Sequence, residues 1–93
     1  MAVMVIANDP TGTPEVAMKY KALLEDKLRT APGFVVQVTG PADGGGYQIV
    51  TVWDSQEDFQ HWFENHVRPV LPAEAQSGPP PRIHQLDTVT VRQ

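Results

Sequence analysis

The order of its apolar segments constrains the fold of this chain more than any other feature. Four short runs rich in β-branched or aromatic residues alternate with turn residues and with two longer stretches of helical periodicity. The predicted strands are residues 2–7, 34–39, 47–53 and 83–91, the predicted helices are residues 14–29 and 55–70, and a loop is predicted at residues 73–81. The chain therefore has the order β-α-β-β-α-β.

Capping signals support both predicted helices. Thr13 followed by Pro14 supplies a capping hydroxyl and a proline at the first helical position, which is typical of a helix start. Asp54 or Ser55 is expected to cap the second helix. Pro69 should end or kink that helix, because proline removes a hydrogen bond and disfavours helix in the residue before it.

The predicted order is that of the ferredoxin-like fold. Its two crossover helices lie on one face of a four-stranded antiparallel sheet, which makes an α+β domain. A chain of 93 residues is long enough for one such domain, so residues 1–93 are expected to form a single unit.

The first strand is apolar on both faces, and this predicts a homodimer. Val3 and Val5 would point to one side of the sheet, and Met4 and Ile6 to the other. Two helices cover only one face, so a second sheet packed back to back is expected to cover the other. If Asn8 faces the helices with Met4 and Ile6, Val5 belongs to the face between the two sheets, and Val5→Asp would dissociate or unfold the dimer.

Composition excludes several classes of partner. The net charge is −4, which argues against nucleic acid or an anionic membrane as the main partner. The chain has no cysteine, so disulfides and thiolate metal sites are excluded. Its longest wholly apolar run, residues 2–7, is far shorter than the roughly 20 residues of a membrane span. With no signal peptide evident, a cytoplasmic protein is expected.

His66 is the main candidate for chemistry. Its spacing from Phe59, Trp62 and Phe63 places all four side chains on the apolar face of the second helix. An imidazole against an aromatic wall could serve as a general base, a proton shuttle or a haem ligand. It could equally be a partly buried histidine that hydrogen-bonds to a backbone carbonyl, and Trp62 could simply be a core residue.

His61 and Asn8 are two further polar candidates. His61 and His66 are five residues apart, so their rings diverge by about 140° around a helix axis, and no metal site is predicted. Asn8 closes the first strand, where its amide could orient a substrate oxygen or could merely begin a turn.

These residues carry a resemblance to a known superfamily. The first strand ends in Asn8, the second is entered through Pro32-Gly33-Phe34, and the segment 52–55 (Val-Trp-Asp-Ser) leads into Phe59-x-x-Trp62. Over nearly its whole length the chain resembles the dimeric α+β barrel superfamily, within it the antibiotic-biosynthesis-monooxygenase-like group.

Three branches of that superfamily imply different chemistry. The haem-degrading branch has an asparagine and a tryptophan at the places of Asn8 and Trp62, but its histidine comes about nine or ten residues after the tryptophan. His66 follows Trp62 by only four, so the resemblance disfavours haem and implies no cofactor. The quinone-forming monooxygenases have an asparagine where Ile49 stands, and the polyketide cyclases a tyrosine at the place of Trp62, with a histidine that His66 could match.

The resemblance favours a cofactor-independent, monooxygenase-like enzyme acting on a hydrophobic aromatic or polyketide-like small molecule between helices and sheet. His66 would move a proton and Asn8 would orient a substrate oxygen. Trp62, the third expected catalytic residue, would belong to the aromatic wall of the pocket. The expected substrate-binding residues are Tyr20, Trp53, Phe59 and Phe63. A cyclase or isomerase using the same histidine is one alternative, and a non-catalytic ligand-binding or assembly domain is another.

Overall fold

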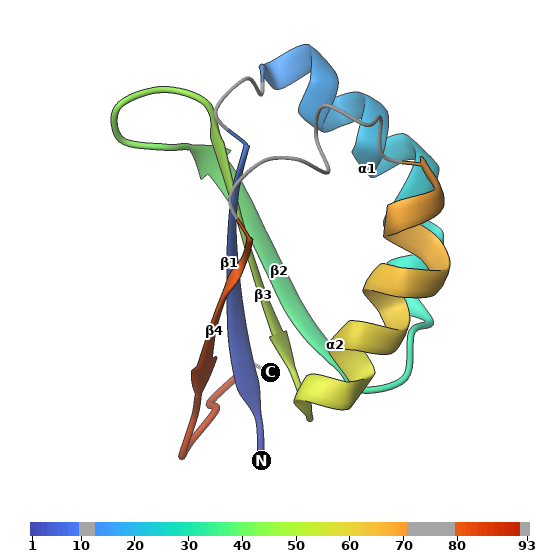
Figure 1. The fold of residues 1–93 in the computed structure, drawn as a ribbon, viewed down its shortest axis with the longest axis vertical. Helices are drawn as coiled ribbons and strands as arrows, with labels where there is room; N and C mark the ends of the chain where they lie inside the picture. The colour runs from blue at the N-terminus through green and yellow to red at the C-terminus, as the bar shows by residue number, and fades with distance from the viewer. Residues whose placement is uncertain (10–12, 71–79, 92–93) are drawn as a thin grey trace.

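The computed structural model describes residues 1–9, 13–70 and 80–91, and it has the predicted order of elements. The elements are β1 (Val3–Asp9), α1 (Pro14–Arg29), β2 (Phe34–Pro41), β3 (Tyr47–Trp53), α2 (Gln56–Trp62), the π-helical turn η1 (Phe63–Val67), the 3-10 turn η2 (Arg68–Val70) and β4 (Arg82–Gln85). The strands form one antiparallel sheet in the order β2-β3-β1-β4. Both helices lie on the same face of this sheet (Figure 1), so the predicted ferredoxin-like fold is confirmed. Most of the predicted loop, residues 73–79, lies outside the described residues.

Local contacts fix the start of α2 against the sheet. The Ser55 hydroxyl accepts a hydrogen bond from the backbone N–H of Asp58 at 3.2 Å and donates one to its carboxylate at 2.9 Å. Ser55, and not Asp54, is therefore the N-cap. Gly33 has a φ of +83° and its carbonyl accepts the N–H of Asp54 at 2.7 Å. A Cβ at Gly33 would overlap the Asp58 carboxylate, so only glycine fits this junction.

The second helix changes geometry before Pro69. From Phe63 onward the backbone widens into a π turn, in which the N–H of Arg68 donates to the carbonyl of Phe63. A short 3-10 turn containing Pro69 follows. The regular α-helix thus gives way at Phe63, six residues before the proline, and the helical turns continue through Pro69 to Val70. A π turn inside a helix is rare and frequently accompanies a functional site.

The orientation predicted for β1 is wrong. Val3 and Val5 are 0% and 2% exposed and pack into one core with Trp62 of α2. Because side chains alternate along a strand, Met4 and Ile6 point to the face without helices. Both sets are apolar, so the alternation in the sequence could not decide which of them faces the helices.

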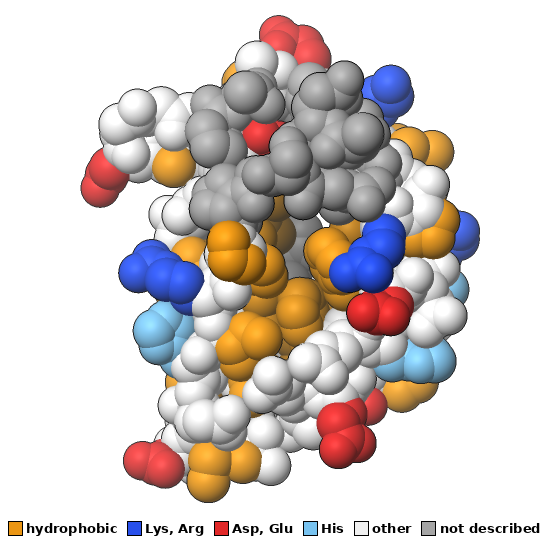
Figure 2. All heavy atoms as spheres, viewed as in Figure 1, with side chains coloured by type: hydrophobic (Ala, Val, Ile, Leu, Met, Phe, Trp, Pro, Cys, Tyr) orange, Lys and Arg blue, Asp and Glu red, His pale blue; other side chains and the backbone are white. Residues whose placement is uncertain are grey.

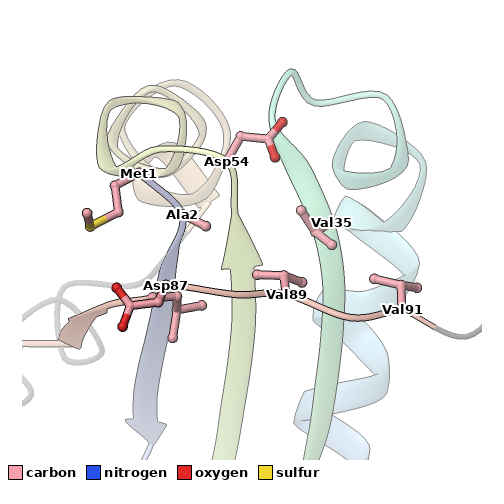
Figure 3. A pocket seen from close by; sticks show the side chains of 8 residues that line it. Met1, Ala2, Val35, Asp54, Asp87, Val89 and Val91 are labelled. Carbon is pink, nitrogen blue, oxygen red and sulfur yellow. The ribbon is translucent and has the colours of Figure 1, made fainter.

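The last strand is shorter than predicted, because β4 stops where its antiparallel partner β1 begins, at Val3. Gln85 pairs with Val3, and the N–H of Leu86 donates to the carbonyl of Ala2 at 2.9 Å. The chain then crosses the end of the sheet (Figure 3), where its residues 86–91 contribute to the lining of a hollow of about 520 Å³.

The sheet face opposite the helices, here called the open face, carries a band of apolar side chains. Its members lie in register across three strands: Met4, Ile6, Val36, Val38, Val50 and Val52. Val36 and Val38 of this band are 39% and 58% exposed in the single chain. Among the described residues, no helix has the length and apolar character needed to cross a membrane.

Candidate functional site

A row of aromatic rings joins the sheet to α2 and to the π turn. Trp53 lies at its centre, with ring centroids 5.5 Å from Phe34, 6.0 Å from Phe59 and 6.2 Å from Trp62. The indole N–H of Trp53 donates to the Thr51 hydroxyl at 2.9 Å, which satisfies its one polar group. Trp53 is fully buried, so in this state it lies behind the wall of any pocket and has no free surface for a ligand.

The row ends at His66, which the π turn places against Trp62. The two ring centroids are 5.2 Å apart with an interplanar angle of 35°. Trp62 is 6% exposed, whereas His66 is half-buried. Within the described part of the chain, no residue hydrogen-bonds to the His66 imidazole. The described residues therefore do not supply the backbone carbonyl that a purely structural histidine would use.

A second branch of the row leads to a basic group. The rings of Phe59 and Phe63 are 5.9 Å apart, and the Arg68 guanidinium lies 5.6 Å from the Phe63 centroid. Arg68 also lies 3.8 Å from the Glu64 carboxylate, an exposed pair that stabilises the helix little. Tyr20, on α1, is half-buried but is not part of the packed core cluster.

Apolar side chains gather in a hollow between the sheet and the helices, with charged groups at its edge (Figure 2). The packed cluster on this side of the sheet brings residues of β1, β3, β4, α1 and α2 together. Its partly buried members are Leu24, Ala31, Phe34, Phe59, Val67 and Ile83. This arrangement can take a flat apolar ligand on the helix side of the sheet.

Asn8 does not lie on that side. It is exposed and, by the alternation of β1, shares the open face with Ile6. Ala7 has the corresponding position toward the helices. The predicted grouping of Asn8 with Trp62 and His66 is therefore corrected. The prediction assigned alternate residues of β1 to the wrong faces of the sheet, and Asn8 moved with them.

The other two histidines are exposed and make none of the ring contacts of the aromatic row. His61 is exposed, and the Asn65 amide lies 3.3 Å from its Nδ1 while donating to its carbonyl at 2.8 Å. His84 is exposed on β4, paired with Met4 and so on the open face. The residues that the structure describes contain no group of three or more side chains suited to hold a metal ion.

Four antiparallel strands with two helices on one face define a ferredoxin-like α+β domain. No protein-family model matches the chain, and no curated protein matches its sequence. Solved structures of haem-degrading proteins do match its fold. A haem-free structure of a haem-degrading protein from Mycobacterium tuberculosis is 24% identical, with a TM-score of 0.65, and the match covers 96% of this chain and 100% of that one.

Two further structures of this fold contain ligands. The haem degrader MhuD from Mycobacterium tuberculosis, with two haems bound in its active site, is 22% identical over 98% of this chain and 100% of its own, with a TM-score of 0.63. A point variant of MhuD with two manganese protoporphyrin IX molecules per active site is 23% identical over 100% and 99%, with a TM-score of 0.59. At these identities the likeness establishes the fold.

The comparisons overturn the prediction that no cofactor is involved and that haem is disfavoured. MhuD, which has this fold, holds haem in its active site, and its point variant holds a manganese porphyrin. The prediction relied on the short spacing between Trp62 and His66, and the sequence did not show that a π turn begins between them.

Proposed function

We propose that this domain binds haem in the hollow between the helices and the sheet and degrades it as a monooxygenase-type enzyme. The observation that carries the proposal is His66, half-buried against Trp62 and without a hydrogen-bond partner among the described residues. The haem-degrading activity of proteins with the same fold supports it.

The histidines of the chain leave one candidate for the iron. The sequence has three, of which His61 is exposed on the polar side of α2 and His84 lies on the open face. Of the three, only His66 contacts the aromatic row, through Trp62. A neutral imidazole is an ordinary axial ligand of haem iron, so the donor at this place fits the group.

The surrounding side chains fit the macrocycle. A porphyrin is flat and apolar, and it is best held by aromatic and aliphatic walls with a few polar groups at the rim. Phe59, Phe63 and the edge of Trp62 would supply the wall. Arg68, beside Phe63, would lie where it can meet a carboxylate of the ligand.

In this proposal His66 and the aromatic row have different roles toward the haem. When bound, haem supplies the iron that activates oxygen. His66 would hold the iron and fix the plane of the ring, and the aromatic row would orient the macrocycle and exclude water from it. A porphyrin substrate replaces the polyketide-like one expected from the sequence, and no observation favours cyclisation or isomerisation.

A single-turnover assay tests the enzyme proposal. Wild-type protein loaded with one equivalent of haemin is mixed with a chemical reductant and oxygen, with catalase present to remove free peroxide. We expect the haem absorption to decay on the protein and chelatable iron to appear in equal amount. If the bound haem persists while free haemin controls behave as usual, the domain is a haem-binding module and not a degrading enzyme.

We also propose that the open face packs against a second copy, in a cytoplasmic protein. The apolar band on this face is too continuous to remain in water. Val38→Lys should therefore convert a dimer to a monomer while preserving the fold, since Val38 is 58% exposed in the single chain. Light scattering at micromolar concentration measures the change, and Met18→Lys, at an apolar position of α1 that is 70% exposed, is the matched control. A wild-type protein that is already monomeric would contradict this proposal.

A further inference from the structure

A polar hollow of about 260 Å³ lies at the hairpin end of the open face, away from the haem-binding hollow. Its lining residues come from β1, β3, β4 and the β2–β3 turn: Asn8, Ala42, Asp43, Gly45, Gln48 and Arg82. Its size suits a small molecule and lies just below the lower end of the range for drug-sized ligands, roughly 300–1,000 Å³. A porphyrin therefore does not belong here.

The sheet register brings the polar side chains of this hollow to one face. Asn8 pairs with Gln48, and Arg82 pairs with Ile6 one row away on the same face. The next residue beyond Gln48 in its row is Gly40, and the space where a side chain would stand is open. This cross-strand row therefore carries the amides of Asn8 on β1 and Gln48 on β3, and it has open space at Gly40 on β2.

The β2–β3 turn forms the remaining wall. Its loop extends to the side of the sheet away from the helices (Figure 1). Gly44 and Gly45 have φ values of +86° and +112°, and hydrogen bonds between Ala42 and Gly46 and between Gly45 and Ala42 close the turn. This glycine-rich geometry positions the turn beside the polar row.

The donors in this hollow have no partners in the described part of the chain. No side-chain hydrogen bond joins Asn8, Gln48 or Arg82 to another described residue, and Arg82 is in no ion pair there. Asp43, on the turn side, is not within ion-pair distance of Arg82. One guanidinium and two amides thus border the hollow without a protein partner among the described residues, and a guanidinium is best matched by a planar carboxylate.

We propose that this hollow binds the carboxylate group of a small organic acid, held by Arg82 with the amides of Gln48 and Asn8. The Asp43 carboxylate disfavours a second negative charge, so the ligand is a monocarboxylate. The site is independent of the proposed haem chemistry, since it lies on the opposite face of the sheet.

Acetate is the probe that tests this site. Sodium acetate is titrated into ¹⁵N-labelled full-length protein at constant ionic strength, and the side-chain amide signals of Asn8 and Gln48 and the Nε–H signal of Arg82 are followed by NMR. We expect saturable shifts with a Kd on the order of 10 mM, because charge-assisted bonds at an exposed site give weak binding. Arg82→Gln should weaken binding by about tenfold or more.

Arg29→Gln is the matched control, because Arg29 is an exposed arginine of α1 paired with Glu25 and far in sequence from the hollow. It should leave the acetate shifts unchanged. The proposal is overturned if acetate gives no saturable shift beyond that of chloride, or if Arg82→Gln binds acetate as tightly as wild type. It is also overturned if Arg82→Gln weakens self-association while acetate does not bind, since a carboxylate of a second copy would then occupy the hollow.

Discussion

Replacing Val5 by Asp is expected to unfold the protomer itself and not merely to separate a dimer. Val5 is 2% exposed and belongs to the core cluster that includes Trp53 and Trp62. A carboxyl group there must be protonated at neutral pH, which costs about 4 kcal/mol for a pKa raised by about three from its ordinary value. Losing the buried valine surface costs about 2 kcal/mol more. A domain of this size has a total stability of about 5–14 kcal/mol, so a loss of this size removes nearly half of it or more.

Urea denaturation followed by far-ultraviolet circular dichroism measures this effect. The matched control is Ile6→Asp, one residue further along β1 but on the open face. We expect the control to retain its folded spectrum and to lose only self-association. A folded Val5→Asp protein beside an unfolded Ile6→Asp protein would show that the helices cover the other face of β1.

Which of the neighbours Val5 and Ile6 faces the helices could not be predicted from the sequence. Helix starts are encoded locally, and one of the two predicted caps, Ser55, caps α2 in the structure because a cap depends on one residue and its immediate contacts. The facing of β1 depends on which of two apolar sets packs better against Trp62, and alternation alone carries no such information. The position of Asn8 was misassigned for this reason.

The candidate site was predictable only in part. The grouping of Trp62 with His66 follows from their spacing of four residues, and their ring contact is present in the structure. The π turn is not visible in the sequence, because it arises where the helix must adjust before Pro69. The end of β4 likewise depends on where β1 begins, a pairing between segments about 80 residues apart.

His66→Ala should have the largest effect on haem. If His66 is the iron ligand, its removal should weaken haemin binding by about 100-fold or more, since even groups that only orient a metal ligand are worth 10–100-fold. The apolar wall would still hold the macrocycle weakly, so binding is reduced and not abolished. The fold should survive, because the imidazole is half-buried and makes no hydrogen bond to a described residue.

Two variants separate ligation from packing. His61→Ala removes an exposed histidine on the same helix and should leave haemin affinity unchanged. Trp62→Ala removes a side chain that is 6% exposed and in contact with Trp53, so it should lower stability by about 3–5 kcal/mol. A His66→Ala protein that loses stability to a similar extent but keeps its haemin affinity would identify His66 as a packing residue.

The absorption spectrum of the haemin complex tests the central claim most directly. Haemin is titrated into wild type, His66→Ala and His61→Ala, and the Soret band is recorded for each. The proposal predicts a saturable, shifted band at one equivalent or a small whole number of equivalents in wild type and His61→Ala, and a weakened band with an altered maximum in His66→Ala. No stoichiometric complex in wild type, or the same spectrum and affinity in His66→Ala, would contradict it.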